Sequence, residues 1–274
     1  MLAEAGRQLG GRVPLEAQLP GLSEWNRVRD YRLQQIERMA NVEIYRESRL
    51  TVDDVFTTEA EHIVIATGAT WRRDGFGRTH VAGLETLQPS DRIFTPDDIM
   101  AGRLPKGRVL IFDDDNYYMG PVIAERLSAS GCNASLVTPE SKVGAWGRYT
   151  AEQIRSQKRL IELEVDIQTG KILLAFKDGT ATVADVYTGQ EEQIAADNLV
   201  LITARQPNDS LYWEVLDRLD TVAAGSPLSV KRIGDCEAPA IIAAAVYSGH
   251  RYARELDSPS DENVPQDRLF DVSA

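Results

Sequence analysis

Three consecutive aspartates, Asp113, Asp114 and Asp115, follow the apolar run VLIF in the stretch VLIFDDDNYYMG, and a helix-like run, PVIAERLSASG, comes next. A nucleotide-binding fold ordinarily has glycines at this place, where a strand ends and a helix N-terminus meets a phosphate. At about 4 Å and an effective dielectric constant of about 20, each pair of like unit charges costs about 4 kcal/mol. The aspartates are therefore expected to oppose a phosphate and must serve another purpose.

Two more apolar runs end in a similar way, at Ala66-Thr67-Gly68 and at Gly234-Asp235, and Glu4 followed by the pair Gly10-Gly11 stands near the start of the sequence. Ligands of open α/β sheets lie beyond the carboxyl ends of the strands. A single glycine at a strand end is more often part of an ordinary turn. In this order, however, the segments together predict a cofactor site.

Two alternative readings of the aspartates remain open at this point. Asp113 and Asp114 could hold Mg²⁺ as in a response-regulator receiver, or Asp113 with Asp115 could resemble a haloacid-dehalogenase nucleophile pair. A receiver also needs a later strand-end aspartate and lysine, and the nearest candidate, Asp166, precedes a predicted hairpin. The histidines His62, His80 and His250 show no metal-ligand spacing.

The elements that would position these residues alternate between strands and helices. Continuous apolar runs at 62–68, 108–112, 134–139, 198–204 and 229–235 indicate parallel strands buried on both faces. We expect a helix over 22–40 with Ser23 as its cap, helices near 120–130, 150–163 and 239–256, and short strands at 42–45 and 49–56. Glycine turns at Thr169-Gly170 and Asp178-Gly179 predict β-hairpins. The fold class is therefore α/β.

The composition indicates which kinds of partner are disfavoured and which cellular compartment is expected. The 274 residues are 43% hydrophobic and carry a formal charge of -12, which disfavours nucleic acid and anionic membranes as partners. Two cysteines, Cys132 and Cys236, lie far apart and indicate neither a disulfide framework nor a cluster site, so we expect a reducing cytoplasm. We also expect no membrane span and no secretory signal.

Several longer blocks carry a resemblance to a known family: EAGRQLGG, IVIATGATWRRDG, FTPDDIMAGRLPKGRVLIFDDDNYYMG, TARQPNDSLYWEVL and IGDCEAPAIIAAAVYSGHRYAREL. From residue 1 to about 257 the sequence resembles the C-terminal portion of the trimethylamine dehydrogenase and dimethylglycine demethylase group of flavoproteins. The 2,4-dienoyl-CoA reductases, of the NADH:flavin oxidoreductase-like class, are more distant relatives. The resemblance implies two Rossmann-like lobes with parallel sheets and β-hairpin insertions.

The resemblance also implies roles for individual residues. Glu4 matches the acidic residue that binds the ribose hydroxyls of an ADP moiety, and Gly10 and Gly11 match the pair that passes close to the cofactor. Ala66, Thr67 and Gly68 match the ATG motif. Gly234 and Asp235 match the aspartate loop beside the ribityl or phosphate end. These residues would hold FAD or ADP in a first lobe made of 1–105 and 198–257, next to a second, vestigial NAD(P)-binding-like lobe at 106–197 and a flexible tail at 258–274.

The GxGxxG loop, expected about 25 to 35 residues before the acidic residue, has no counterpart before Glu4. We therefore expect a first lobe without its initial βα unit, in a truncated reading frame or one piece of a split gene. The resemblance implies a TIM barrel with FMN and a [4Fe-4S] centre only in a missing N-terminal part. It further implies oxidative demethylation of an amine, electron transfer to a protein acceptor resembling electron-transfer flavoprotein, and a homo-oligomeric complete protein. The alternative is a non-catalytic nucleotide-binding module; no catalytic residue is assigned.

Overall fold

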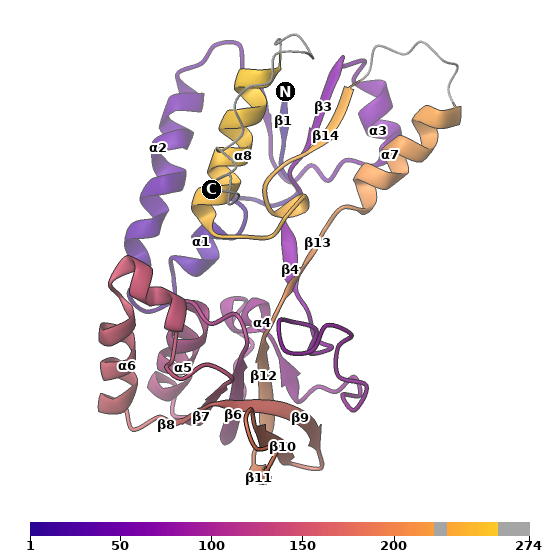
Figure 1. Cartoon of the computed structure of the whole chain (residues 1–274). Helices are drawn as coiled ribbons and strands as arrows, with labels where there is room; N and C mark the ends of the chain where they lie inside the picture. Colours follow the sequence, from indigo (N-terminus) through magenta and orange to yellow (C-terminus); the bar gives the residue numbers. More distant parts are fainter. Residues whose placement is uncertain (222–228, 257–274) are drawn as a thin grey trace, which may run out of the picture.

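A five-stranded parallel sheet forms the centre of one half of the computed structural model, which describes residues 1–221 and 229–256 (Figure 1). Its strands lie in the order β5-β12-β6-β7-β8 and pair in parallel throughout. Their bounds are Ile93–Phe94 for β5, Arg108–Asp113 for β6, Asn133–Thr138 for β7, Asp166–Thr169 for β8 and Asn198–Ile202 for β12. The fold is thus a mixed α/β structure with parallel strands, as predicted.

The two faces of this sheet are covered differently. Alternate residues of β6 point to opposite faces: Val109 and Ile111 join the apolar cluster under the helices, and Leu110 and Phe112 join the cluster on the other side. The helical segments of this half are α4 (Pro96–Met100), α5 (Met119–Ala129), η2 (Ala145–Thr150) and α6 (Gln153–Glu162). An antiparallel sheet covers the other face and contains β9 (Lys171–Lys177), β10 (Thr180–Asp185) and β11 (Glu191–Ala195). We call this half the five-stranded half.

The second half contains two separate pairs of parallel strands. β1 (Leu2–Ala3) pairs with β2 (Ile44–Tyr45), and β3 (His62–Ile65) pairs with β14 (Ser229–Arg232). In Figure 1, α2 and α8 lie on one side of these strands, and α3 and α7 on the other. The helical segments are α1 (Val13–Glu16), η1 (Ser23–Trp25), α2 (Asn26–Glu37), α3 (Val52–Thr57), α7 (Ser210–Thr221), η3 (Gly234–Cys236) and α8 (Ile242–Glu255). We call this half the paired-strand half.

The two halves are connected by a short antiparallel ribbon. β4 (Ala69–Trp71) leaves the paired-strand half and pairs with β13 (Arg205–Pro207), which returns to it. The five-stranded sheet includes residues 93–94 and 198–202, which lie outside the predicted 106–197 lobe. The predicted tail at 258–274 lies outside the described residues.

Three local predictions are wrong, each for a physical reason. Residues 52–57 form a helix instead of a strand, because the Thr51 hydroxyl accepts the Asp54 N–H while the Asp54 carboxylate accepts the Thr51 N–H, a capping box. Ser23 is no cap of α2, whose N-terminus follows directly from η1 without a side-chain bond. No hairpin forms at Thr169-Gly170, because β8 pairs with β7 and β9 pairs with β10.

The hairpin at Asp178-Gly179 is confirmed by the antiparallel pairing of β9 with β10. Burial of the strand at 62–65 is not as predicted: Ile65 is buried, whereas Val64 is 37% exposed. β3 has a single strand neighbour, β14, within the described residues, so its other edge lacks the packing that an internal strand receives. No helix in the described part is long and apolar enough to cross a membrane.

Candidate functional site

The predicted cofactor residues lie at the carboxyl ends of the strands in the paired-strand half. Glu4 follows β1, Ala66-Thr67-Gly68 follow β3, and Gly234-Asp235 follow β14. The Thr67 hydroxyl lies 3.1 Å from the Cys236 Sγ, so the second and third segments are in contact. The half-buried Glu4 uses its Oε1 to accept the N–H of Gly6 at 2.7 Å. This bond fixes the turn that follows β1.

All four predicted glycines, Gly10, Gly11, Gly68 and Gly234, have a positive φ, and two of them show what the backbone needs there. Gly10 has φ +114°, and a Cβ there would lie 2.8 Å from the Arg29 side chain. Gly68 has φ +75°, and no heavy atom lies within 4 Å of the position that its Cβ would take. The left-handed backbone favours glycine at both positions, and the open space beside Gly68 leaves the backbone accessible at the end of β3.

Asp235 is the centre of a buried network of charges that the sequence reasoning missed. Its Oδ2 accepts hydrogen bonds from Arg12 Nε at 2.8 Å and from Arg205 at 2.9 Å, and its Oδ1 accepts the Ala240 N–H at 3.1 Å. Both guanidinium groups also donate to the Ala240 carbonyl oxygen. Three segments that are distant in the sequence are therefore fixed together where the two halves meet.

Glu16 and Tyr118 complete this network. Arg12 donates to Glu16 Oε1 at 2.5 Å and to the Tyr118 hydroxyl at 3.1 Å, and that hydroxyl donates to Glu16 Oε2 at 2.8 Å. Burial lowers the pKa of Arg12, but the carboxylates of Glu16 and Asp235 outweigh it, so the pKa lies above its usual value. Burial raises the pKa of Tyr118. The sequence feature that could have indicated the two arginines is their position. Arg12 comes directly after the glycine pair, and Arg205 comes just after the apolar run 198–204.

The three aspartates lie in the five-stranded half with their side chains engaged separately. Asp113 is fully buried, and its Oδ1 accepts the Asn116 N–H at 3.0 Å. A Cβ on Gly120 would lie only 2.1 Å from its Oδ2, so the carboxyl group packs against the first turn of α5. Burial and the nearby Asp115 raise the pKa of Asp113 to about 8. Asp113 therefore occupies the space at the N-terminus of α5.

Asp114 binds a different segment. Its carboxylate accepts the Thr79 N–H at 2.8 Å and the Thr79 hydroxyl at 2.6 Å. Burial raises the pKa of Asp115, an effect opposed by Arg205, Arg78 and Arg12. Within the described ranges, no group of three His, Cys, Asp or Glu side chains is placed to hold a metal. The carboxylates of Asp113 and Asp114 thus bind different partners, the Asn116 N–H and Thr79.

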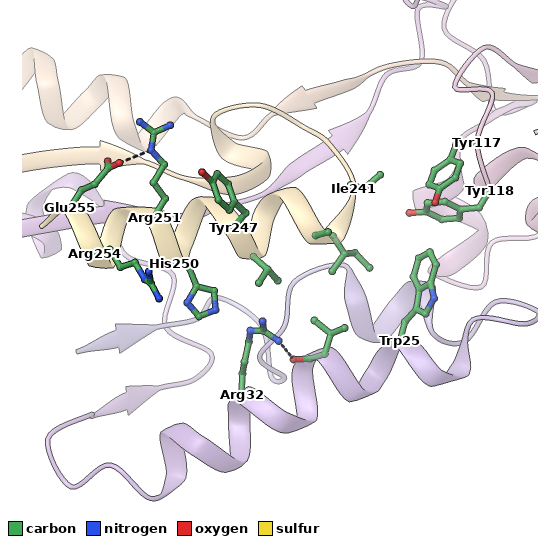
Figure 2. Close-up of a pocket in the computed structure, with 14 residues that line it drawn as sticks. Trp25, Arg32, Tyr117, Tyr118, Ile241, Tyr247, His250, Arg251, Arg254 and Glu255 are labelled. Carbon is green, nitrogen blue, oxygen red and sulfur yellow. Dashed lines mark hydrogen bonds and ion pairs between the residues drawn. The ribbon is translucent and has the colours of Figure 1, made fainter. Parts of the chain in front are cut away.

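A groove of about 810 Å³ runs between α2 and α8 (Figure 2). Trp25, Tyr117 and Tyr118 lie at one end, next to Ile241, and Arg32, His250 and Arg254 lie towards the other. Trp25 meets Tyr118 edge to face, with ring centroids 4.7 Å apart. Tyr118 thus belongs both to the wall of this groove and to the charged network.

Comparison with known proteins gives consistent matches over most of the chain. Residues 94–223 match the OYE-like second alpha/beta domain. Dimethylamine dehydrogenase from Hyphomicrobium sp. (strain x) is 31% identical, in an alignment that covers 96% of this chain and 39% of that protein. The solved structure of histamine dehydrogenase from Rhizobium sp. 4-9 superposes with a TM-score of 0.91 at 44% identity, covering 96% of this chain and 41% of that one. The chain is homologous to these amine dehydrogenases.

A third relative agrees with this homology. The 6-hydroxypseudooxynicotine amine oxidase of Pseudomonas geniculata N1 is 38% identical, with a TM-score of 0.86 over 91% of this chain. The predicted resemblance to an amine-oxidising oxidoreductase group is therefore confirmed at the level of homology. The chain spans about two fifths of the length of the amine dehydrogenases that it matches.

Proposed function

We propose that this chain is the C-terminal, dinucleotide-binding module of a flavin-dependent amine dehydrogenase of the trimethylamine dehydrogenase and dimethylglycine demethylase type. The observation that carries the proposal is the similarity to histamine dehydrogenase over 96% of this chain but only 41% of that protein. In the proposed protein, the remaining part would hold FMN and a [4Fe-4S] centre, and FMN would supply the chemistry that oxidises the amine. Electrons then pass to a protein acceptor, and the whole protein is a cytoplasmic homo-oligomer.

The paired-strand half is the proposed FAD or ADP lobe. The arrangement that supports this is the position of Glu4 and the glycine segments beyond the carboxyl ends of parallel strands, where nucleotides bind in α/β sheets. Glu4 would accept hydrogen bonds from the ribose hydroxyls. The backbone of Gly10, Gly11, Ala66, Thr67, Gly68 and Gly234 would line the cofactor. Asp235 would act indirectly, by positioning Arg12 and Arg205, because its carboxylate accepts hydrogen bonds from both guanidinium groups.

The five-stranded half is the proposed vestigial lobe. Its phosphate position at the start of α5 is filled by the Asp113 carboxyl group, which is fully buried. A dinucleotide would have to displace this group and approach Asp115 as well, so we propose that NADH and NADPH do not bind here. This fits an enzyme that takes electrons from an amine and transfers them to another protein. The chain's own residues supply nucleotide binding and the contact between the halves.

Calorimetric titration tests the nucleotide site. ADP should bind the chain, and Glu4→Ala should weaken binding by about 1–3 kcal/mol, because ribose hydroxyls would lose a charged partner. Glu24→Ala is the matched control, since the Glu24 side chain is 70% exposed and pairs with Arg27 on the surface. Equal ADP affinity for wild type and Glu4→Ala would contradict the assignment. Micromolar NADPH binding that Asp114→Lys abolishes would contradict the vestigial role of the second lobe.

A further inference from the structure

We infer that the surface formed by η2 and α6, in the five-stranded half, is the docking site of an acidic, amphipathic helix of another protein. Four exposed apolar side chains lie at its centre, and we call them the α6 surface: Trp146, Tyr149, Ile154 and Ile161. The inference goes beyond the proposed function, because none of these residues belongs to the proposed nucleotide site or to the charged network around Asp235.

The helix α6 has more apolar surface than its own fold uses. Leu160 is 1% exposed and packs in the core, whereas Ile154 is 80% and Ile161 is 62% exposed. The two isoleucines are seven residues apart, which places them on one face of the helix with about 10 Å between them. In Figure 1, α6 lies at the outer edge of the five-stranded half. The helix therefore has one apolar face in the core and a second apolar stripe in water.

Two aromatic side chains of η2 extend this stripe. Trp146 is 47% and Tyr149 is 71% exposed, and their ring centroids are 6.3 Å apart. Each ring also contacts a guanidinium group: Arg78 lies 4.7 Å from the centroid of Trp146, and Arg148 lies 4.6 Å from that of Tyr149. Trp, Tyr and Arg are the residue types that most often dominate the binding energy of protein interfaces. The α6 surface thus has the composition of an interface centre.

The turn between η2 and α6 holds these side chains in fixed positions. The Trp146 N–H donates to the Asn116 carbonyl oxygen at 3.0 Å, and the Glu152 N–H donates to that of Gly147 at 2.9 Å. Between them, Ala151 has φ +61°, a left-handed conformation that is unfavourable for any residue with a Cβ. A surface that is already ordered loses little conformational entropy when a partner binds.

The charges around the α6 surface are opposite in sign to the net charge of the chain. Residues 142–159 contain five Lys or Arg residues and one acidic residue, whereas the whole chain has a formal charge of -12. Arg155 is exposed directly beside Ile154, and the side chain of Lys158 is 75% exposed although it pairs with Glu162 at 3.6 Å. Complementary charges across an interface select and orient the partner. The partner that these cations select is acidic.

A helix is the form of partner that matches the apolar stripe. Helical ligands present apolar side chains at i, i+3, i+4 and i+7, and the last spacing is that of Ile154 and Ile161. A second copy of this chain, related by a twofold axis, would place the same cations opposite one another. An anionic membrane would meet the negative charge of the rest of the chain. The observations therefore favour an acidic helix of another protein.

A titration with a defined peptide tests the inference. The probe is a synthetic peptide of about 18 residues, or five helical turns, with leucine at i, i+3, i+4 and i+7 and glutamate elsewhere. Its fluorescein-labelled form should bind the full chain with a Kd below about 100 μM in an anisotropy titration. The Kd should rise when NaCl increases from about 50 to about 300 mM, because salt screens the attraction. The same peptide with serine in place of leucine should show no measurable binding.

Two variants locate the site. Ile154→Asp should raise the Kd of the leucine peptide about tenfold or more, because it replaces an apolar anchor with a repelling carboxylate. Arg155→Glu should raise it about fivefold through charge alone. Arg92→Glu is the matched control and should bind like wild type. The exposed Arg92 precedes β5, at the opposite edge of the five-stranded sheet from β8, into which α6 leads.

The outcomes distinguish the possible occupants of the α6 surface. No binding of the leucine peptide, an equal Kd for wild type and Ile154→Asp, or a Kd that falls with added salt overturns the inference. A chain that dimerises in sedimentation equilibrium, becomes monomeric with Ile154→Asp and does not bind the peptide assigns the surface to a second copy and also overturns it. Binding to phosphatidylglycerol vesicles instead of the peptide, abolished by Ile154→Asp, does the same in favour of a membrane. ADP affinity should be equal in all variants, since the proposed nucleotide site lies in the other half.

Discussion

The two halves of this protein contain parallel strands of similar sequence character but very different burial. In the five-stranded half, Leu110, Leu136 and Leu199 are 0% exposed. In the paired-strand half, Leu2 and Val64 are each 37% exposed. The difference follows from the number of strand neighbours. Strands β6, β7 and β12 have a strand on each side and layers on both faces, whereas β1 and β3 each have one strand partner among the residues that the structure describes. An apolar run therefore predicts that a strand is suited to burial on both faces. Whether the strand is in fact buried depends on the number of neighbouring strands with which it pairs.

Matched leucine truncations should sharpen this comparison most. Leu136→Ala on β7 should lower the free energy of unfolding by about 2–5 kcal/mol, since it removes a fully buried side chain and leaves a cavity. Leu2→Ala on β1 should cost less than about 1 kcal/mol, because that side chain already contacts water. Urea unfolding followed by circular dichroism gives both values. Similar losses for the two variants would contradict the difference in packing between the halves.

The buried Asp113 should give the five-stranded half a distinctive pH dependence. Its pKa rises from the usual 3.8 to about 8 in the folded protein, so the fold retains a proton that the unfolded chain releases. The contribution of this group to stability is complete below about pH 4 and is lost as the pH rises to about 8. Between about pH 5 and 8, the free energy of unfolding should fall by roughly 3.6 kcal/mol from this group alone.

Asp113→Asn tests that dependence directly. The asparagine keeps a carbonyl oxygen for the Asn116 N–H and does not titrate, so the slope of unfolding free energy against pH should decrease. Asp91→Asn, at an exposed aspartate, is the control and should leave the slope as in wild type. An unchanged slope in Asp113→Asn would show that this carboxyl group is ionised throughout the range.

The smallest expected effect on stability concerns the capping boxes. One capping box occurs in each half, so the two can be compared. Thr51 and Asp54 cap α3 on the surface, whereas Thr95 and Asp98 cap α4, and there Thr95 is 1% exposed. Loss of a capping hydroxyl costs about 0.5–2 kcal/mol. Thr51→Ala should fall at the low end and Thr95→Ala at the high end, because Thr95 is buried and water cannot replace the bond from its hydroxyl to the Asp98 carboxylate. Thermal unfolding of both variants would measure the order, and a reversed order would contradict this explanation.

Much of the fold could be predicted from apolar periodicity, since the strands at β6, β7, β12 and β14 and the helices α5, α6 and α8 occur close to where the sequence places them. The failure at 49–56 came from a local competition. The alternating residues there suit a strand, but Thr51 and Asp54 satisfy two backbone N–H groups and favour a helix. The prediction of a hairpin at Gly170 failed because the sequence does not show that the chain passes there from one sheet to another.

The candidate site was predictable only in part. Strand ends identify Glu4, Gly68 and Asp235, because a strand's carboxyl end can be read from the apolar run before it. Arg12 follows a glycine pair and Arg205 follows an apolar run, but 193 positions separate them, and only the fold shows that both bind Asp235. The sequence predicted that the aspartates oppose a phosphate. It could not show that burial raises the pKa of Asp113 or that Asp114 binds Thr79.

The ribbon of β4 and β13 allows the five-stranded half to be regarded as a domain inserted into the paired-strand half. The chain enters the five-stranded half after Trp71 and leaves it before Arg205, and these two residues are paired neighbours in the ribbon. A domain inserted between two adjacent points of a host fold leaves the spacing of the host's elements unchanged, whatever the length of the insert. The five-stranded half can accordingly lengthen or shorten between these two points without altering the register of the strands on either side, provided that Tyr118 keeps its bonds to Arg12 and Glu16.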